Sequence, residues 1–497
     1  MRRVFWLAFA AFFLVGAAWA VALPVNGTYD EKHHIARAYA VVSGQWLPRG
    51  PAPDPAGYGF EGFDVPASLL PGDVDCMRLP VPRPASCLKP AGPRTETVRV
   101  TSNTARYSPV YYLPVGLPML VSPNTAGIIA GRLVSAALSA LLLALAAATA
   151  FRYAGRLALA AVALVATPMV MNLAGAINPN GLEIAAGVLL FASLLPLARG
   201  APPTRGLVWQ AGAAMLLLLT LRQFGPLLCA VDVLACLALA GPETRRALLR
   251  DRDTRRIIGG AALLGVAFFA FWVLVSGWAY VRPLPRFARH ERTGTLLREV
   301  ATVRVRFYLQ QIVGQFGYGE AGISRLAIAL WYALWAVPVL AVLWTAARRV
   351  KLVLVGLAVF CGALLVGLEL RYAPVVGWSQ HGRYVLPTAV GIVLVAAWYA
   401  PPALAGRRWL PLALVAATVP VHGYALARTM TRYQAGLGAP LDPFGGVWTP
   451  PGGPLVALAT AGAGLALLAA LVWRSSTAGE VPTTVVASRS TTNVTTD

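Results

Sequence analysis

Long apolar runs recur along almost the whole chain and are separated by short polar segments. Most runs approach the roughly 20 residues that a helix needs to cross a bilayer. Open sheets cannot satisfy their backbone groups in lipid, so spanning segments of this kind are helices. The pattern predicts an all-α, polytopic integral membrane protein with about twelve transmembrane helices, eleven at least and thirteen at most. The predicted spans are residues 5–23, 125–150, 157–177, 182–198, 207–221, 224–241, 257–278, 326–346, 352–369, 385–400, 409–428 and 454–473.

Charged residues between the runs predict the orientation. Arg2 and Arg3 precede the first run, and basic residues return at every second connection, as at Arg152, Arg348 and Arg407. Under the positive-inside rule these connections and both termini are cytoplasmic. The first run could instead be a cleaved signal peptide, since the segment 18–20 has the small-x-small pattern of a cleavage site. In either case the segment that follows faces outward, on the extracytoplasmic side of the membrane.

The predicted multispan domain covers residues 1–474 and has a long first extracytoplasmic loop, 24–124. We expect a short helix over 31–46 lying at the membrane interface, then an irregular Pro- and Gly-rich stretch over 47–93. Cys76 and Cys87 lie in that stretch, and outside the cytoplasm such a pair forms a disulfide. Cys229, Cys236 and Cys361 lie in apolar runs and are interpreted as packing residues. A Ser/Thr-rich tail, 475–497, is predicted to be disordered and cytoplasmic.

A second outer loop, 279–325, departs from the positive-inside rule. Attraction to anionic lipid headgroups would explain its basic residues, and so would a site for a phosphate or pyrophosphate group. Both interpretations stay open. The loop holds Arg282, Arg286, Arg289, Arg292, Arg298, Arg304, Arg306 and Arg325, opposed by Glu291, Glu299 and Glu320.

Composition agrees with the membrane setting. Of the 497 residues, 57% are hydrophobic and only 12% are charged, against about 25% charged in an ordinary soluble protein. The net charge of +22 lies largely in short loops that fix topology, so it does not indicate nucleic-acid binding. No phosphate-binding loop, dinucleotide fingerprint or serine-hydrolase elbow is present.

Asp30 and Glu31, just beyond the first span, are the strongest candidates for chemistry. Carboxylates near a bilayer lose hydration, which marks them as functional and predicts a raised pKa suited to a general base. Asp30 is the candidate base, or else a charge that sets the helix angle. Glu31 is an orienting partner or second acid, or else a first-turn residue favoured by the helix dipole.

Four other outer residues are candidate substrate contacts, three in the first outer loop and one just before the span 385–400. His34 lies four residues beyond Asp30 and shares its face in a helix. Arg37 is either a ligand or a snorkelling side chain. Arg383 follows the polar run 379–382 at the start of a span and is the main candidate for binding phosphate. Tyr111 lies in the aromatic segment 107–114.

Arg282 and Arg371 are secondary phosphate candidates, and Arg222 is interpreted as an anchor at the outer end of a span. We expect no cofactor. A divalent cation held with substrate phosphate by Asp30, Glu31 and His34 stays open. The chain has only five histidines, and none show metal-ligand spacing.

Several motifs together resemble the bacterial predicted membrane protein family catalogued as domain of unknown function 2142. The resemblance covers roughly residues 5–399, and Asn180 and Tyr318 depart from the commoner pattern. The motifs are 30–39 (DEKHHIARAY), 107–114 (YSPVYYLP), 178–181 (NPNG), 314–318 (GQFGY) and 380–387 (QHGRYVLP).

That family is similar in plan to the GT-C glycosyltransferases, which take a sugar from a polyprenyl-phosphate donor at the outer face. The resemblance implies an acidic base in the first outer loop and an envelope glycan, lipid or protein as acceptor. Architecture alone does not fix function. A transporter or flippase of lipid-linked sugars, or a non-catalytic envelope scaffold, are the alternatives. Transporters usually show internal repeats, and the sequence has no clear one.

Overall fold

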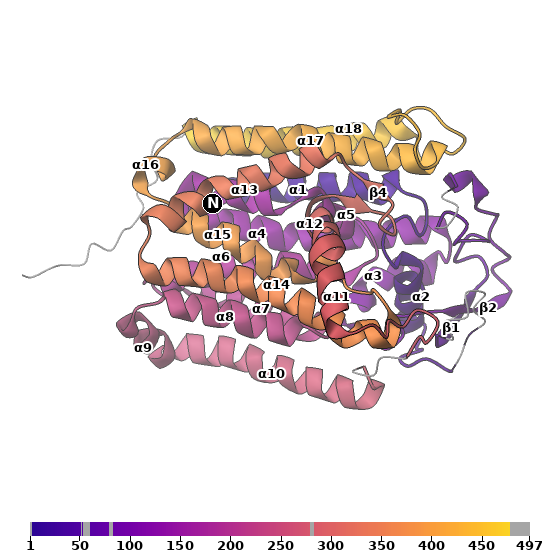
Figure 1. Cartoon of the computed structure of the whole chain (residues 1–497), viewed down its shortest axis with the longest axis horizontal. Coiled ribbons are helices and arrows are strands. Elements are labelled where there is room, and N and C mark those ends of the chain that lie inside the picture. Colours follow the sequence, from indigo (N-terminus) through magenta and orange to yellow (C-terminus); the bar gives the residue numbers. More distant parts are fainter. Residues whose placement is uncertain (1, 51, 53–59, 79–82, 279–282, 478–497) are drawn as a thin grey trace, which may run out of the picture.

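The computed structural model describes residues 2–50, 52, 60–78, 83–278 and 283–477, and its long helices run side by side in one bundle (Figure 1). Within these ranges, eight helices are long and apolar enough to cross a membrane. They are α1 (Arg2–Ala22), α4 (Thr125–Val165), α6 (Pro179–Ala198), α10 (Arg252–Ser276), α13 (Arg325–Thr345), α14 (Arg348–Val376), α17 (Trp409–Ala435) and α18 (Pro454–Thr477).

Shorter apolar helices complete the bundle, so the prediction of an all-helical, multispan membrane protein is confirmed. The total of twelve spans stays a prediction, because four of these helices are shorter than a bilayer is thick. They are α3 (Pro109–Val121), α7 (Arg205–Leu221), α8 (Gly225–Leu239) and α15 (Leu386–Trp398).

The predicted span 157–177 is wrong as one continuous helix. Helix α4 bends at Gly155, whose φ of 77° and ψ of −161° suit only glycine. Its second limb ends at Val165, and α5 (Pro168–Ala174) starts afresh with Thr167 as its N-cap. Pro168 cannot donate a backbone hydrogen bond, so it begins a helix here where the hydrophobic pattern predicted continuity.

The first outer loop is more ordered than predicted. Strands β1 (Gly62–Pro66) and β2 (Thr97–Thr101) pair antiparallel, with Gly62 opposite Thr101 and Pro66 opposite Thr97. The prediction that 47–93 is irregular is therefore wrong for β1. The sequence near β1 did not reveal the strand, because its partner lies more than 30 residues further along the chain. A second ribbon joins β3 (Gln315–Phe316) to β4 (Ala321–Gly322).

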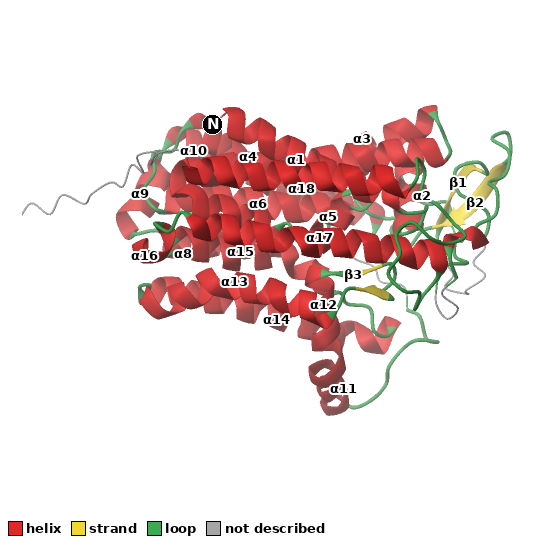
Figure 2. Cartoon of the chain, turned by 90° about the horizontal axis from the view of Figure 1, so that it is seen from above, coloured by secondary structure: helices red, strands yellow, loops and turns green. Residues whose placement is uncertain are grey.

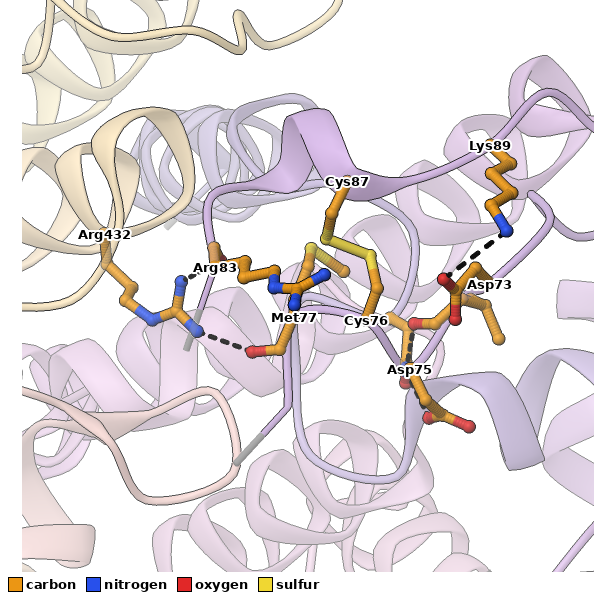
Figure 3. The surroundings of a disulfide bond; sticks show 10 residues. Asp73, Asp75, Cys76, Met77, Arg83, Cys87, Lys89 and Arg432 are labelled. Carbon is orange, nitrogen blue, oxygen red and sulfur yellow. Dashed lines mark hydrogen bonds and ion pairs between the residues drawn. A yellow bond between two sulfur atoms is a disulfide. The ribbon is translucent and has the colours of Figure 1, made fainter. Parts of the chain in front are cut away.

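The predicted disulfide between Cys76 and Cys87 is confirmed. Figure 3 shows that the disulfide closes a loop beside α17. The short turn η1 (Ala85–Cys87) is part of this loop. Arg432 of α17 donates hydrogen bonds to the carbonyl oxygens of Met77, at 2.6 Å, and Arg83, at 2.8 Å. The loop is therefore pinned both covalently and to the bundle. The three remaining cysteines are buried in helices, as predicted.

Helix α2 (Glu31–Val42) confirms the predicted helix but not its place at the membrane interface. Ten of its residues, from Glu31 to Val41, are buried. It packs between α3 and the β1–β2 ribbon at one end of the bundle (Figure 1). Asp30, which precedes α2, is therefore held in place by the packing of this helix within the protein.

The two ends of the bundle differ, as Figures 1 and 2 show. The β1–β2 ribbon, α2 and α3 gather at one end, which the charge pattern predicts to be the outer one. The opposite end carries α9 (Pro242–Arg250) and α16 (Pro402–Ala405). Helix α18 extends through Thr477, so the first three residues of the predicted disordered tail are helical. The rest of that tail lies outside the described residues.

Candidate functional site

A cavity of about 250 Å³ opens at the α2 end of the bundle, and Asp30 and Arg383 both line it. Its walls come from the first outer loop, the start of α6, the α7–α8 turn, the end of α14 and the segment before α15. The candidate base and the main candidate for binding phosphate thus line the same cavity. The lining residues are Asp30, His34, Asn103, Thr104, Tyr107, Asn178, Asn180, Arg222, Gln223, Phe224, Tyr372, Val376, Ser379, Gln380, Arg383 and Tyr384.

Asp30 is held in an uncommon backbone conformation. Its φ of 58° lies in the left-handed region, which a residue with a side chain adopts at some cost in energy. Its carbonyl oxygen accepts the first hydrogen bonds of α2, from His33 and His34 at 3.0 and 3.2 Å. The carboxylate makes no capping hydrogen bond and instead accepts one from Asn103 at 3.3 Å. The strained turn therefore delivers the carboxylate to the cavity rather than to the helix end.

Arg383 is almost completely buried and incompletely paired. Its Nη2 lies 3.5 Å from Oδ2 of Asp30, and its guanidinium group stacks 3.9 Å over the ring of Tyr29. Its Nε and Nη1 have no hydrogen-bond partner among the described residues. Buried donors without acceptors are unfavourable, so these two groups call for a partner that the described residues do not supply.

The segment that carries Arg383 is fixed by α12 (Val305–Val313). A Cβ atom on Gly382 would lie 2.1 Å from the carbonyl oxygen of Tyr308, so only glycine fits there. The backbone N–H of Gly382 donates to Oε1 of Gln311 at 2.8 Å. Nε2 of Gln311 lies 2.9 Å from the hydroxyl of Tyr29. Gly382 therefore packs directly against α12.

A second cation, Arg222, faces the same cavity. Its Nη1 lies 3.5 Å from Oε2 of Glu183, and Asn180 donates to that oxygen at 3.0 Å. The sequence interpretation of Arg222 as an anchor missed this network. The cost of an ionic group between two apolar runs was the available signal, because such a group needs a partner.

The pKa of Asp30 differs from the prediction. Burial raises it, but the positive charge of Arg383 is the largest of the opposing effects, and together these hold the pKa well below its usual range. Asp30 is therefore ionised. Burial lowers the pKa of His33 to about 4 and that of His34 to about 3, so both imidazoles are neutral near pH 7.

Glu31 does not line the cavity. Its carboxylate is fully buried and pairs with Arg132 of α4, at 2.6 and 2.7 Å. Arg132 also donates to the carbonyl oxygens of Ala20, Leu23 and Pro24 at the end of α1. Glu31 thus orients the chain around Asp30 and does not contact the cavity that a second acid would use. Arg132 was missed, although an arginine within an apolar run calls for a partner.

The cation site considered from sequence is not assembled, because Glu31 is directed toward Arg132. Among the described residues, no group of three or more His, Cys, Asp or Glu side chains could hold a metal ion. His34 does line the cavity, and its Nδ1 lies 2.7 Å from the hydroxyl of Tyr112.

Three other predicted contacts, Arg37, Tyr111 and Arg371, do not line the cavity. Arg37 is fully buried and donates to the carbonyl oxygens of Tyr107 and Trp46 at 2.8 Å, which is a structural role. The hydroxyl of Tyr111 lies 2.9 Å from that of Ser135, inside the bundle. Arg371 is exposed on α14. Arg282 lies outside the described residues.

The family model for a predicted membrane protein (DUF2142) matches residues 13–392. The chain belongs to this family. The match includes Asp30, Arg222 and Arg383, so the whole cavity falls within the family region. A comparison with curated protein sequences found no match.

The solved structures similar to this DUF2142 protein include the following three. Crystal structures of ArnT from Cupriavidus metallidurans, bound to undecaprenyl phosphate and in the apo state, share 15% and 13% identity and have a TM-score of 0.39 each. The alignments cover 94% and 92% of this chain and 76% and 75% of ArnT. A mutant of arabinofuranosyltransferase AftD from Mycobacteria shares 16% identity, with a TM-score of 0.40, over 87% of this chain and 28% of AftD.

Proposed function

We propose that this protein is a GT-C-like membrane glycosyltransferase. It transfers a sugar from a polyprenyl-phosphate donor to an envelope glycan, lipid or protein at the outer face of the plasma membrane, with Asp30 as base. One observation carries the proposal: an ionised carboxylate and an incompletely paired, buried guanidinium group line one cavity.

The cation arrangement supports a phosphate ligand. The guanidinium groups of Arg383 and Arg222 lie 5.2 and 4.9 Å from the centre of the Tyr384 ring. Two arginines near one aromatic ring can share the oxygens of a phosphate group, since each presents a fork of donors. The free N–H groups of Arg383 make it the first ligand, and Arg222 the second.

The position of Asp30 supports a role as base. Its side chain is 28% exposed, whereas that of Arg383 is 1% exposed, so the carboxylate is the more accessible partner. In the reaction, Asp30 takes the proton of the acceptor hydroxyl, whose oxygen forms a bond to the anomeric carbon of the donor. The bond from that carbon to the phosphate oxygen breaks, and the polyprenyl phosphate departs with the electron pair, which inverts the anomeric configuration.

The donor itself would strengthen the base. Arg383 lowers the pKa of Asp30, and a phosphate group bound to Arg383 would offset that positive charge. Burial, which raises the pKa, would then weigh more. Asp30 is therefore expected to accept a proton more readily once the donor is bound.

Reconstitution tests this function against its alternatives. The purified protein is placed in vesicles with polyprenyl-phosphate sugars labelled in the sugar, together with a panel of envelope acceptors. A glycosyltransferase converts the labelled donor to product and free polyprenyl phosphate. A flippase moves intact donor between leaflets without turnover, and a scaffold does neither. Movement without turnover would overturn the proposal.

A further inference from the structure

Residues 293–313 form a helical segment that lies across the bundle. It consists of α11 (Thr293–Glu299), η2 (Val300–Arg304) and α12. Figure 1 shows α11 running across the long helices at a steep angle, and Figure 2 shows it projecting beyond them. The backbone just before it follows the end of α14, where Arg289 N–H donates to the carbonyl oxygen of Ala373 at 2.8 Å. The segment therefore crosses the long helices beside the end of α14 that borders the cavity.

Four arginines on and before this segment are exposed: Arg286, Arg292, Arg298 and Arg306. We call them the outer basic face. The described part of the chain gives none of them an ion pair with a carboxylate, while the nearby acidic residues are taken by other arginines. Glu291 and Glu299 pair with Arg289 at 2.8 and 3.0 Å, and Glu369 pairs with Arg304 at 2.8 Å.

Apolar side chains are exposed among these arginines. Leu297 is 43% exposed, Val303 62% and Leu309 45%. A helix that mixes exposed apolar and cationic residues suits the boundary between acyl chains and headgroups, where arginine stems lie along apolar surface and their charges reach the phosphates. Free phosphate or nucleic acid would leave the apolar groups in water, so the mixture favours a lipid.

We propose that the outer basic face binds the headgroups of anionic phospholipids in the outer leaflet. The charges are complementary, and the positive-inside rule offers no reason for arginines on this side. The proposal is independent of the glycosyltransferase function, because none of the four arginines lines the cavity.

Lipid docking here would also bear on the cavity. Arg304 of η2 donates to the carbonyl oxygen of Gln380 at 2.7 Å, and Gln311 of α12 accepts from Gly382. The segment that touches lipid thus holds the residues on either side of His381, two positions before Arg383. Anchoring α11 and α12 to lipid would stabilise the position of the phosphate-binding arginine.

The test measures binding of fluorescent phosphatidylglycerol, with phosphatidylcholine as comparison, to the full chain in mild detergent. The variant is Arg298→Gln with Arg306→Gln. At ~1 kcal/mol for each basic residue at an anionic surface, the affinity for phosphatidylglycerol should fall about fivefold per arginine. Binding of phosphatidylcholine should not change.

Two further variants make the outcome decisive. Lys89→Gln with Arg94→Gln removes two charges from exposed residues of the first outer loop and should leave lipid binding unchanged. Arg298→Lys with Arg306→Lys keeps the charge and should keep most of the binding, even if the glutamine variant folds poorly. Equal affinity of the unaltered protein for the two lipids would overturn the proposal. So would an equal loss in the control from the first outer loop.

Discussion

Nη2 of Arg383 lies 3.5 Å from Oδ2 of Asp30, although 353 residues separate the two along the chain. The contact joins the turn before α2 to the segment before α15 across the cavity. At this distance the attraction is electrostatic with a weak hydrogen bond, which leaves the arginine able to turn toward another anion. Each residue therefore sets the charge environment of the other, and the predictions for the site follow from that coupling.

Asp30→Asn should abolish sugar transfer without affecting folding. A positioned general base contributes about 10²- to 10⁴-fold to a rate, and the amide cannot accept the proton. Turnover of labelled polyprenyl-phosphate sugar in vesicles measures the loss. The matched control is Asp64→Asn, which removes a carboxylate that pairs with Arg99 in the outer ribbon, away from the cavity. Full activity in the Asp30 variant would remove this residue from the role of base.

Arg383→Gln should weaken donor binding more than it slows the bound complex. Each charge-assisted hydrogen bond lost is worth ~1.5–3 kcal/mol, so KM for the donor should rise about tenfold to a hundredfold. Steady-state kinetics with varied donor measure this. Arg371→Gln is the control, because it removes an exposed arginine of α14 that does not line the cavity. Equal effects of the two substitutions would mean that general charge, and not the cavity, governs donor binding.

The pH dependence of activity should lack an acid limb from Asp30 between pH 5 and 8. Arg383 keeps the pKa of this carboxyl well below its usual value of about 4, so the base is ionised throughout that range in the free enzyme. The stabilising effect of the pair is present above the unfolded pKa and is lost only as pH falls through the lower folded value.

Removing Arg383 should shift the acid limb that comes from Asp30 to higher pH. In Arg383→Gln, burial still raises the pKa of Asp30 but the main opposing charge is gone, so kcat/KM should begin to fall at a higher pH. The measurement is the profile of kcat/KM against pH for both proteins. The same acid limb in both would show that the two residues are not electrostatically coupled.

Replacing both Cys76 and Cys87 with serine should loosen the outer loop without disturbing the bundle. The bridge limits the freedom of the loop, an effect worth ~2–4 kcal/mol, while Arg432 still holds Met77 and Arg83. Hydrogen exchange should rise across 73–78 and 83–89 and stay unchanged in α17. A reducing agent should reproduce the effect in the unaltered protein. Unchanged exchange in both cases would mean that the Arg432 contacts alone order the loop.

The sequence predicts the helical membrane fold, the helix after Asp30 and the disulfide, and it singles out Asp30 and Arg383, which the structure brings together at one cavity. These depend on local signals: apolar runs of spanning length, sidedness of charge, and polar residues at span ends. Sidedness is informative for the site because it places residues at the same end of the bundle regardless of their separation in the chain.

The errors share a different cause. The pairing of β1 with β2, the Glu31–Arg132 pair and the Arg222–Glu183–Asn180 network each join segments that sequence spacing cannot bring together. The pKa of Asp30 was wrong for the same reason, since desolvation was anticipated and the opposing charge of Arg383 was not counted. Buried charges in apolar runs signal that a partner exists, but not which residue it is.

Breaking the Glu31–Arg132 pair should destabilise the protein strongly. Both side chains are almost fully buried, so Glu31→Gln or Arg132→Gln leaves a charge without its partner, at a cost of ~3–5 kcal/mol. Glu31 also accepts from the N–H of Asn26 at 3.1 Å, a hydrogen bond that the amide oxygen of glutamine can still accept, so the loss reports mainly on the ion pair. Unfolding by denaturant in detergent measures the free energies.

The double substitution distinguishes a specific pair from general packing. Glu31→Gln with Arg132→Gln should cost less than the two single effects added together, because neither charge is then left alone. Asp64→Asn, which breaks the more exposed pair with Arg99, should cost at most ~1 kcal/mol and serves as the control. Strictly additive effects at 31 and 132 would show that the two residues act independently. Their contact would then not be what holds the end of α1 against the turn that presents Asp30.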